Sequence, residues 1–91
     1  MPRDINYKML PEGLRGGMKR YIEEGIKPGD FLQAVICNKL KESFARADFT
    51  NSVRMYDIVE FLHGEAPATC CGSVEIMNDW MEKGGLNVKN H

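Results

Sequence analysis

Short amphipathic segments separated by Gly and Pro recur along this chain of 91 residues. Both residue types interrupt helices, so their positions limit each helix to a few turns. Apolar residues recur at helical spacing within the segments, which predicts an all-α fold, a compact single-domain bundle of about four short helices over residues 10–85. We expect residues 1–9 to form a flexible N-terminal arm and residues 86–91 a flexible tail.

The first two helices have clear start and stop signals. The first is expected to begin at Pro11 and to be capped by Gly25, with an apolar stripe formed by Leu14, Met18, Tyr21 and Ile22. The second is expected to begin at Asp30, whose carboxylate suits a helix N-terminus. Its broad apolar arc predicts a central helix and consists of Phe31, Leu32, Val35, Ile36, Leu40 and Phe44.

Residues 47–52 are rich in side chains that compete for backbone hydrogen bonds, which predicts a turn and a new N-cap. A third helix is expected from Val53 to His63, ended by Gly64 and Pro67. Its predicted inward side chains are Val53, Ile58, Val59 and Leu62. A fourth short helix is expected between Ser73 as N-cap and Gly84, with the apolar stripe Val74, Met77, Trp80 and Met81.

The formal net charge is −1, from 12 basic and 13 acidic residues. This balance gives no general attraction to nucleic-acid backbones or anionic membranes. No apolar run approaches the roughly 18 residues that a membrane span needs, and the N-terminus has no apolar signal segment. We therefore predict a cytoplasmic protein that does not bind membranes, and we consider a general nucleic-acid-binding role disfavoured.

The three cysteines are an odd number, and Cys70 and Cys71 are adjacent, which favours free thiols in a reducing compartment. A zinc site formed with Cys37 and His63 is disfavoured, because adjacent cysteines do not reproduce the usual Cys-x2–4-Cys spacing. We predict no metal site and no cofactor. His63 as the base of a nucleophilic cysteine has no local motif to support it, so the chain is predicted not to be an enzyme.

Glycines gather in the first helix, although each costs about 0.8–1 kcal/mol relative to alanine inside a helix. Gly13, Gly16 and Gly17 lie beside the apolar stripe and near Arg20. They form a flat flank that another backbone or an anionic ligand could approach closely. Packing within the chain is the simpler interpretation. If a partner or an anionic ligand approaches the flank instead, Gly13, Gly17 and Arg20 are the candidate binding residues.

The expected second helix also carries a polar stripe, Asn38, Glu42 and Arg46, at i, i+4 and i+8. An exposed ion pair between Glu42 and Arg46, worth about 0.2–0.5 kcal/mol, is the simpler interpretation. In a binding interpretation Asn38 donates and accepts hydrogen bonds, Arg46 grips a carboxylate or phosphate, and Asp48 orients the arginine.

Aromatic residues supply the remaining candidates. Trp80, near Met77 and Met81, either closes the small core or offers an adaptable apolar surface to a partner. Tyr56 flanks the apolar side of the third helix and is a candidate for stacking on a ligand.

Several motifs, taken together, resemble a family of small helical proteins encoded by bacteriophages, prophages and plasmids. The resemblance spans residues 10–85 and rests on LPEGLRGG (10–17), YIEEGIKPGDFLQAV (21–35), FARAD (44–48), EAP (65–67), CGS (71–73) and Trp80. Relatives commonly have Leu-Pro where this chain has Met55-Tyr56, and Trp-Gly-Ser where it has Cys71-Gly72-Ser73. The resemblance implies an accessory protein of a mobile element and assigns no catalytic or binding residue.

Three functions follow as hypotheses. The leading one is a non-enzymatic binder that inhibits a host protein in the host cytoplasm, such as a component of a defence system, in the manner of anti-CRISPR proteins. The alternative is a homo-oligomeric sponge that sequesters a nucleotide signal, using Tyr56, Trp80, Arg20 and Arg46. A small DNA-binding regulator is the third, although the helix expected at 53–63 offers only Arg54 as a basic contact.

Overall fold

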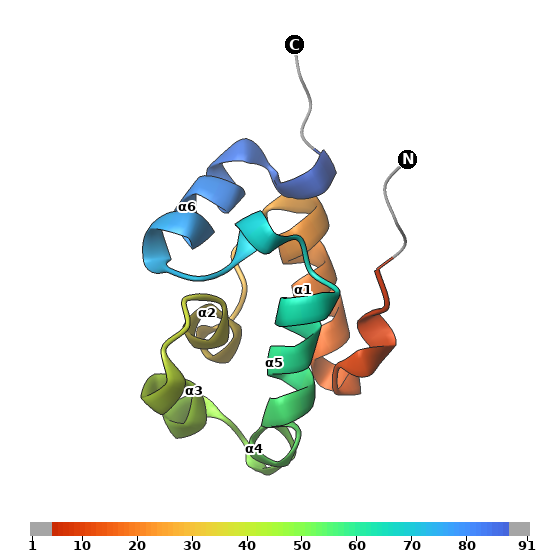
Figure 1. Ribbon diagram of the computed structural model, residues 1–91, viewed down its shortest axis with the longest axis vertical. Helices are drawn as coiled ribbons and strands as arrows, with labels where there is room; N and C mark the ends of the chain where they lie inside the picture. The colour runs from red at the N-terminus through yellow and green to blue at the C-terminus, as the bar shows by residue number, and fades with distance from the viewer. Residues whose placement is uncertain (1–4, 88–91) are drawn as a thin grey trace.

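The computed structural model describes residues 5–87, and every regular element in that range is helical (Figure 1). The predicted all-α fold is confirmed, but the described part contains six α-helices rather than about four. These are α1 (Glu12–Glu24), α2 (Asp30–Ile36), α3 (Leu40–Arg46), α4 (Phe49–Val53), α5 (Met55–Gly64) and α6 (Val74–Lys83). Short 3-10 helices accompany them at η1 (Tyr7–Met9), η2 (Ala68–Cys70) and η3 (Gly85–Asn87).

The first and last α-helices begin and end close to where their sequence signals place them. α1 is capped by Gly25 at φ 70°, and α6 by Gly84 at φ 89°, a left-handed conformation that glycine adopts without strain. The Ser73 side chain accepts a hydrogen bond from the backbone N–H of Ile76 at the start of α6. Gly and Ser signals therefore predicted both helices.

The single helix expected from Asp30 to Phe44 is wrong, because the chain breaks between α2 and α3. Asn38 adopts a left-handed conformation with φ 63°. The N–H of Lys39 donates to the carbonyl of Ala34, and the N–H of Asn38 donates to that of Val35, the two hydrogen bonds of a Schellman motif. The break turns Leu40 and Phe44 outward, so the predicted apolar arc is buried only over α2.

The helix expected from Val53 to His63 corresponds to α5, but the segment 47–52, expected to form a turn, contributes to a further helix, α4, which meets α5 at Arg54. Asp48 caps α4, since its carboxylate accepts a hydrogen bond from the N–H of Asn51 at 2.8 Å. This confirms the predicted N-cap but starts the helix before Val53. Val53 and Val59 are exposed rather than inward, because the buried face of α5 is formed instead by Met55, Ile58, Phe61 and Leu62.

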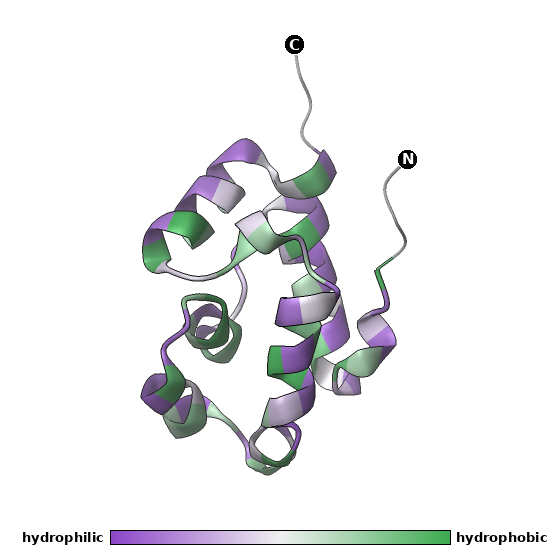
Figure 2. Ribbon diagram, in the orientation of Figure 1, coloured by the Kyte–Doolittle hydropathy of each residue, from purple (hydrophilic) through white to green (hydrophobic). Residues whose placement is uncertain are grey.

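The core lies between α1, α2, α5 and α6, and α2 is apolar over most of its length (Figure 2). Three hydrogen bonds from two buried aromatic side chains connect α1 to the C-terminal third of the chain. The Trp80 indole N–H donates to the carbonyls of Tyr21 (3.0 Å) and Ile22 (3.2 Å), and the Tyr21 hydroxyl donates to the carbonyl of Cys70 (2.6 Å). These bonds satisfy the polar atoms of both aromatic residues inside the core.

Backbones touch where η3 crosses the end of α1. A Cβ added at Gly85 would lie 2.6 Å from the carbonyl oxygen of Ile22 and 2.7 Å from the nitrogen of Gly25. A Cβ added at Gly25 would lie 2.9 Å from the backbone of Gly84. Side-chain-free residues on both segments therefore allow this contact.

The segments expected as a flexible arm and tail contain regular structure where they are described. Residues 5–9 include η1 and pack on the core, because the Tyr7 hydroxyl donates to the Glu23 carboxylate at 2.9 Å and the Tyr7 ring lies 5.6 Å from that of Phe61. Leu86 and Asn87 belong to η3. Residues 1–4 and 88–91 of the predicted arm and tail lie outside the described residues.

Candidate functional site

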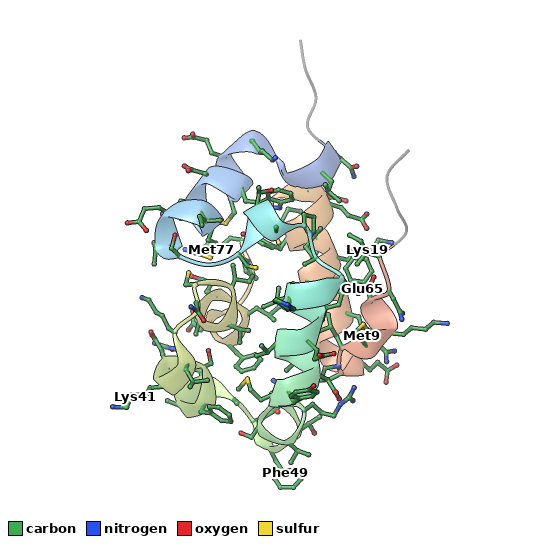
Figure 3. The ribbon with its side chains drawn as sticks, in the orientation of Figure 1. Met9, Lys19, Lys41, Phe49, Glu65 and Met77 are labelled. Carbon is green, nitrogen blue, oxygen red and sulfur yellow. The ribbon has the colours of Figure 1, made fainter. Side chains whose placement is uncertain are left out.

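Exposed apolar side chains concentrate on α3, α4 and the first half of α5. The largest exposed fraction belongs to Phe49, at 83%, and Figure 3 shows this side chain projecting away from the body of the protein. α3 and α4 form the end of the molecule opposite α6 (Figure 1). We call this set of residues the apolar end: Leu40, Phe44, Phe49, Val53 and Tyr56.

The helix breaks explain why these side chains face outward. Leu40 and Phe44 on α3, and Phe49 and Val53 on α4, are each spaced i, i+4, so each pair shares one helix face. Both helices are too short to bury two faces, and both present these pairs to solvent. The apolar end is therefore a product of the chain turning at Asn38, Asp48 and Arg54.

Charged side chains near the apolar end bind one another. The Arg46 guanidinium lies 3.3 Å from the Glu42 carboxylate and 3.4 Å from that of Asp30. Arg54 contacts the Asp57 carboxylate at 2.6 Å and donates to the carbonyl of Met9 at 3.1 Å. These exposed pairs leave both signs of charge close to balance, and their arginines lie on or directly beside the helices that carry the apolar end.

A separate hollow of about 360 Å³ lies between α2, α5 and the segment that follows η2. Apolar side chains form most of its wall, and Asn38, His63 and Cys71 contribute polar atoms; the other lining residues are Val35, Ile36, Val59, Leu62, Ala68 and Gly72. The N–H of Gly72 donates to the carbonyl of Ile36 at 2.7 Å, which fastens the 71–72 segment to α2.

The three cysteines are free thiols in different surroundings. Cys37 is buried with its sulfur 3.6 Å from that of Met77, and burial raises the pKa of its thiol. A hydrogen bond from Cys70 lowers the pKa of the half-buried Cys71 thiol to about 7. The same hydrogen bond, together with complete burial, raises the pKa of Cys70.

The glycine flank of α1 contacts another helix only at Gly17. A Cβ on Gly17 would lie 3.4 Å from Leu32 of α2, and one on Gly16 would lie 3.1 Å from the Arg20 guanidinium. Gly13 has nothing within 4 Å of its Cβ position. Gly17 therefore serves the packing of α1 on α2, while Gly13 and Arg20 remain at the surface.

The predicted polar stripe is corrected by the break at Asn38. Asn38 terminates α2 and no longer lies on one helix face with Glu42 and Arg46. The expected Glu42–Arg46 pair is present at 3.3 Å. Asp48 does not orient Arg46, since its carboxylate caps α4; Asp30 takes that position instead.

Trp80 is corrected as a surface candidate, because its side chain is 2% exposed and its N–H is bonded to α1. The interpretation of Trp80 as core closure is the one that the structure bears out. Tyr56 is 74% exposed, and its hydroxyl donates to the Glu60 carboxylate at 3.3 Å. Of the two aromatic candidates, only Tyr56 is accessible to a partner.

Over residues 5–87, no group of three or more His, Cys, Asp or Glu side chains is arranged to hold a metal ion. None of the helices in the same range combines the length and hydropathy that crossing a bilayer requires. Comparison of the chain with protein-family models, with curated proteins and with solved structures gives no match.

Sequence reasoning missed both the apolar end and the hollow. It assigned Leu40, Phe44 and Val53 to the core, because helical spacing is the same for a buried face and an exposed one. The hollow draws its walls from segments far apart in the chain, so no spacing indicates it. One available signal was the polar run Asn38-Lys39 after an apolar segment, since asparagine tolerates the left-handed conformation that ends a helix.

Proposed function

We propose that this protein is a non-enzymatic binding domain that acts by covering a surface of another protein, with the apolar end as its contact surface. The observation that carries the proposal is the exposure of Phe49, Val53 and Tyr56 on adjoining short helices. Exposed apolar patches rimmed by paired charges are typical of protein interfaces. The paired charges of Arg46, on α3, and Arg54, at the end of α4, are consistent with this pattern.

The energy available from such a contact is substantial. Full burial of one large apolar side chain contributes about 1.5–3 kcal/mol, and aromatic residues dominate the binding energy of many interfaces. Phe49 and Tyr56 are the most exposed large apolar side chains described. They are the residues from which we expect most of the affinity.

The resemblance to proteins of mobile elements supports a host protein as the partner. We propose inhibition by occupancy, in which the domain covers a surface that a host factor, such as a defence component, needs for its own assembly. The nucleotide sponge is less favoured, because Trp80 is buried and Arg46 is paired with two carboxylates. The DNA-binding alternative is also less favoured, since Arg54 is bound to Asp57 and to the Met9 carbonyl.

Two matched double variants test the proposal. Phe49→Ser with Tyr56→Ser changes the apolar end, and Ile26→Ser with Ile76→Ser changes exposed apolar side chains elsewhere. Each tagged protein is expressed in a bacterial host, its fold is checked by circular dichroism, and co-purifying proteins are quantified by mass spectrometry. We expect at least one host protein to be retained by the natural chain and the Ile26/Ile76 variant but lost by the Phe49/Tyr56 variant.

A host protein with this pattern is then purified, and its dissociation constant for the three chains is measured. Loss of one aromatic anchor costs about 2 kcal/mol or more at a hot spot, so we expect affinity to fall at least about 30-fold. The proposal is refuted if the two double variants retain the same host proteins, or if the purified partner binds all three chains equally.

A further inference from the structure

The hollow between α2 and α5 has the size and composition of a small-molecule site. Its volume of about 360 Å³ lies within the range of roughly 300–1,000 Å³ that is usual for ligand pockets. Ligand pockets are also lined mainly by apolar side chains with a few placed polar groups. Here the apolar wall is supplied by α2 and α5, and the polar groups are Asn38, His63 and Cys71.

The Cys71 thiol is held at this wall rather than displayed on a loose loop. The N–H of the adjoining Gly72 donates to α2 at 2.7 Å, and the Cys71 thiol, when protonated, donates to the Leu62 carbonyl on α5 at 3.9 Å. The neighbouring Cys70 is fully buried, and its carbonyl accepts the Tyr21 hydroxyl at 2.6 Å. The core therefore fixes the backbone on both sides of the Cys71 sulfur.

The surroundings of Cys71 favour a reactive sulfur. The Cys70 thiol donates a hydrogen bond to it, which stabilises the thiolate form and lowers the pKa of Cys71 to about 7. The thiolate is the nucleophilic form of cysteine, and it attacks soft, polarisable carbon atoms. Cys70 itself is buried and has a raised pKa, so Cys71 is the more accessible and the more acidic of the two adjacent thiols.

We propose that this hollow binds small apolar α,β-unsaturated carbonyl compounds and that Cys71 forms a covalent adduct with them. The thiolate sulfur bonds to the β-carbon, the π electrons of the C=C bond move to the α-carbon, and the α-carbon takes a proton from water. No oxidant, reductant or leaving group is needed. The apolar wall of the hollow contacts the apolar part of the ligand, and the Cys71 thiolate reacts with the β-carbon of the ligand.

This site is independent of the proposed contact through the apolar end. Phe49 and Tyr56 do not line the hollow, and Cys71 and His63 do not belong to the apolar end. Failure of one proposal therefore leaves the other standing.

Two maleimides with the same reactive group test the inference. N-phenylmaleimide carries an apolar body and N-methylmaleimide does not, and intact-protein mass spectrometry gives the rate of adduct formation with each at pH 7. The ratio of the two rates is compared with the same ratio for glutathione, which has no pocket. We expect the protein's ratio to be about tenfold higher, and peptide mapping to place the adduct on Cys71.

Two variants distinguish binding in the hollow from the general reactivity of an accessible thiol. Val59→Gln makes part of the wall polar at an exposed position and should return the ratio to that of glutathione, while the N-methylmaleimide rate changes less than twofold. Cys70→Ala removes the hydrogen-bond donor and should slow both reagents equally at pH 7. A ratio equal to that of glutathione, an adduct mainly on Cys37 or Cys70, or an unchanged ratio in Val59→Gln overturns the proposal.

Discussion

Alanine at Gly85 should destabilise the fold far more than alanine at the adjacent Gly84. Both glycines have positive φ, 74° and 89°, so each substitution carries the cost of a left-handed residue, about 1–2 kcal/mol. A Cβ at Gly84 meets open space, whereas one at Gly85 would lie 2.6 Å from the Ile22 carbonyl oxygen. Carbon atoms contact favourably only at about 3.5–4.0 Å, so the end of α1 or η3 must move.

Forcing extra atoms into a packed region costs about 1–3 kcal/mol. We therefore expect Gly85→Ala to lower the free energy of unfolding by about 1–3 kcal/mol more than Gly84→Ala does. The effect of alanine on the unfolded chain, about 0.4–1 kcal/mol, is shared by both variants and cancels in the difference. The comparison thus isolates the contact between η3 and α1.

Urea unfolding followed by the fluorescence of Trp80, the single tryptophan, measures both variants. With a slope of about 1–3 kcal/mol per molar urea, the midpoint of Gly85→Ala should lie about 1 M below that of Gly84→Ala. Equal midpoints would show that η3 does not pack backbone to backbone on α1, and the reasoning would be refuted.

Three further predictions concern stability. Burial raises the pKa of Tyr21, so the folded protein keeps this phenol protonated, and its contribution to the free energy of unfolding is complete below pH 10 and decreases above it. Urea unfolding between pH 9 and 11 should show a loss of this free energy that is smaller in Tyr21→Phe than in the natural chain, by up to about 1.4 kcal/mol per pH unit. Equal losses in the two chains would contradict this prediction. Asn38→Ala should cost about 1 kcal/mol while Asn38→Gly costs nothing in thermal unfolding, because only alanine is strained at φ 63°; equal melting temperatures would argue against the break. Asp48→Ala should cost about 1 kcal/mol by losing the α4 cap, whereas Asp48→Asn should keep most of it; an unchanged melting temperature in Asp48→Ala would exclude the cap.

The elements that the sequence predicted well are those whose ends are marked by local chemistry. Gly25 ends α1 and Ser73 begins α6 through hydrogen bonds within a few residues, so neighbouring letters suffice to indicate them. The breaks at Asn38 and Arg54 carry no glycine or proline. Asparagine only tolerates the left-handed conformation, so its use there depends on tertiary packing.

The candidate site was harder to predict because it depends on which faces the breaks leave exposed. Leu40 and Phe44 have the spacing of a core stripe, and only the turn at Asn38 sends them to solvent. Trp80 is the converse case, because tryptophan is common at interfaces whereas the indole N–H of Trp80 donates a hydrogen bond inside the core. The Glu42–Arg46 pair was predictable because i, i+4 neighbours need only a single helical turn.

The contact between α1 and the last helices has a consequence for biosynthesis. The carbonyls of Tyr21 and Ile22 receive their side-chain donor from Trp80, and the end of α1 receives its covering backbone from η3. The ribosome synthesises α1 early, whereas Trp80 and η3, which contact α1, are synthesised only after most of the described chain. The core therefore closes after α6 and η3 emerge from the ribosome, and until then Met18, Tyr21 and Ile22 are available to chaperones that recognise apolar segments.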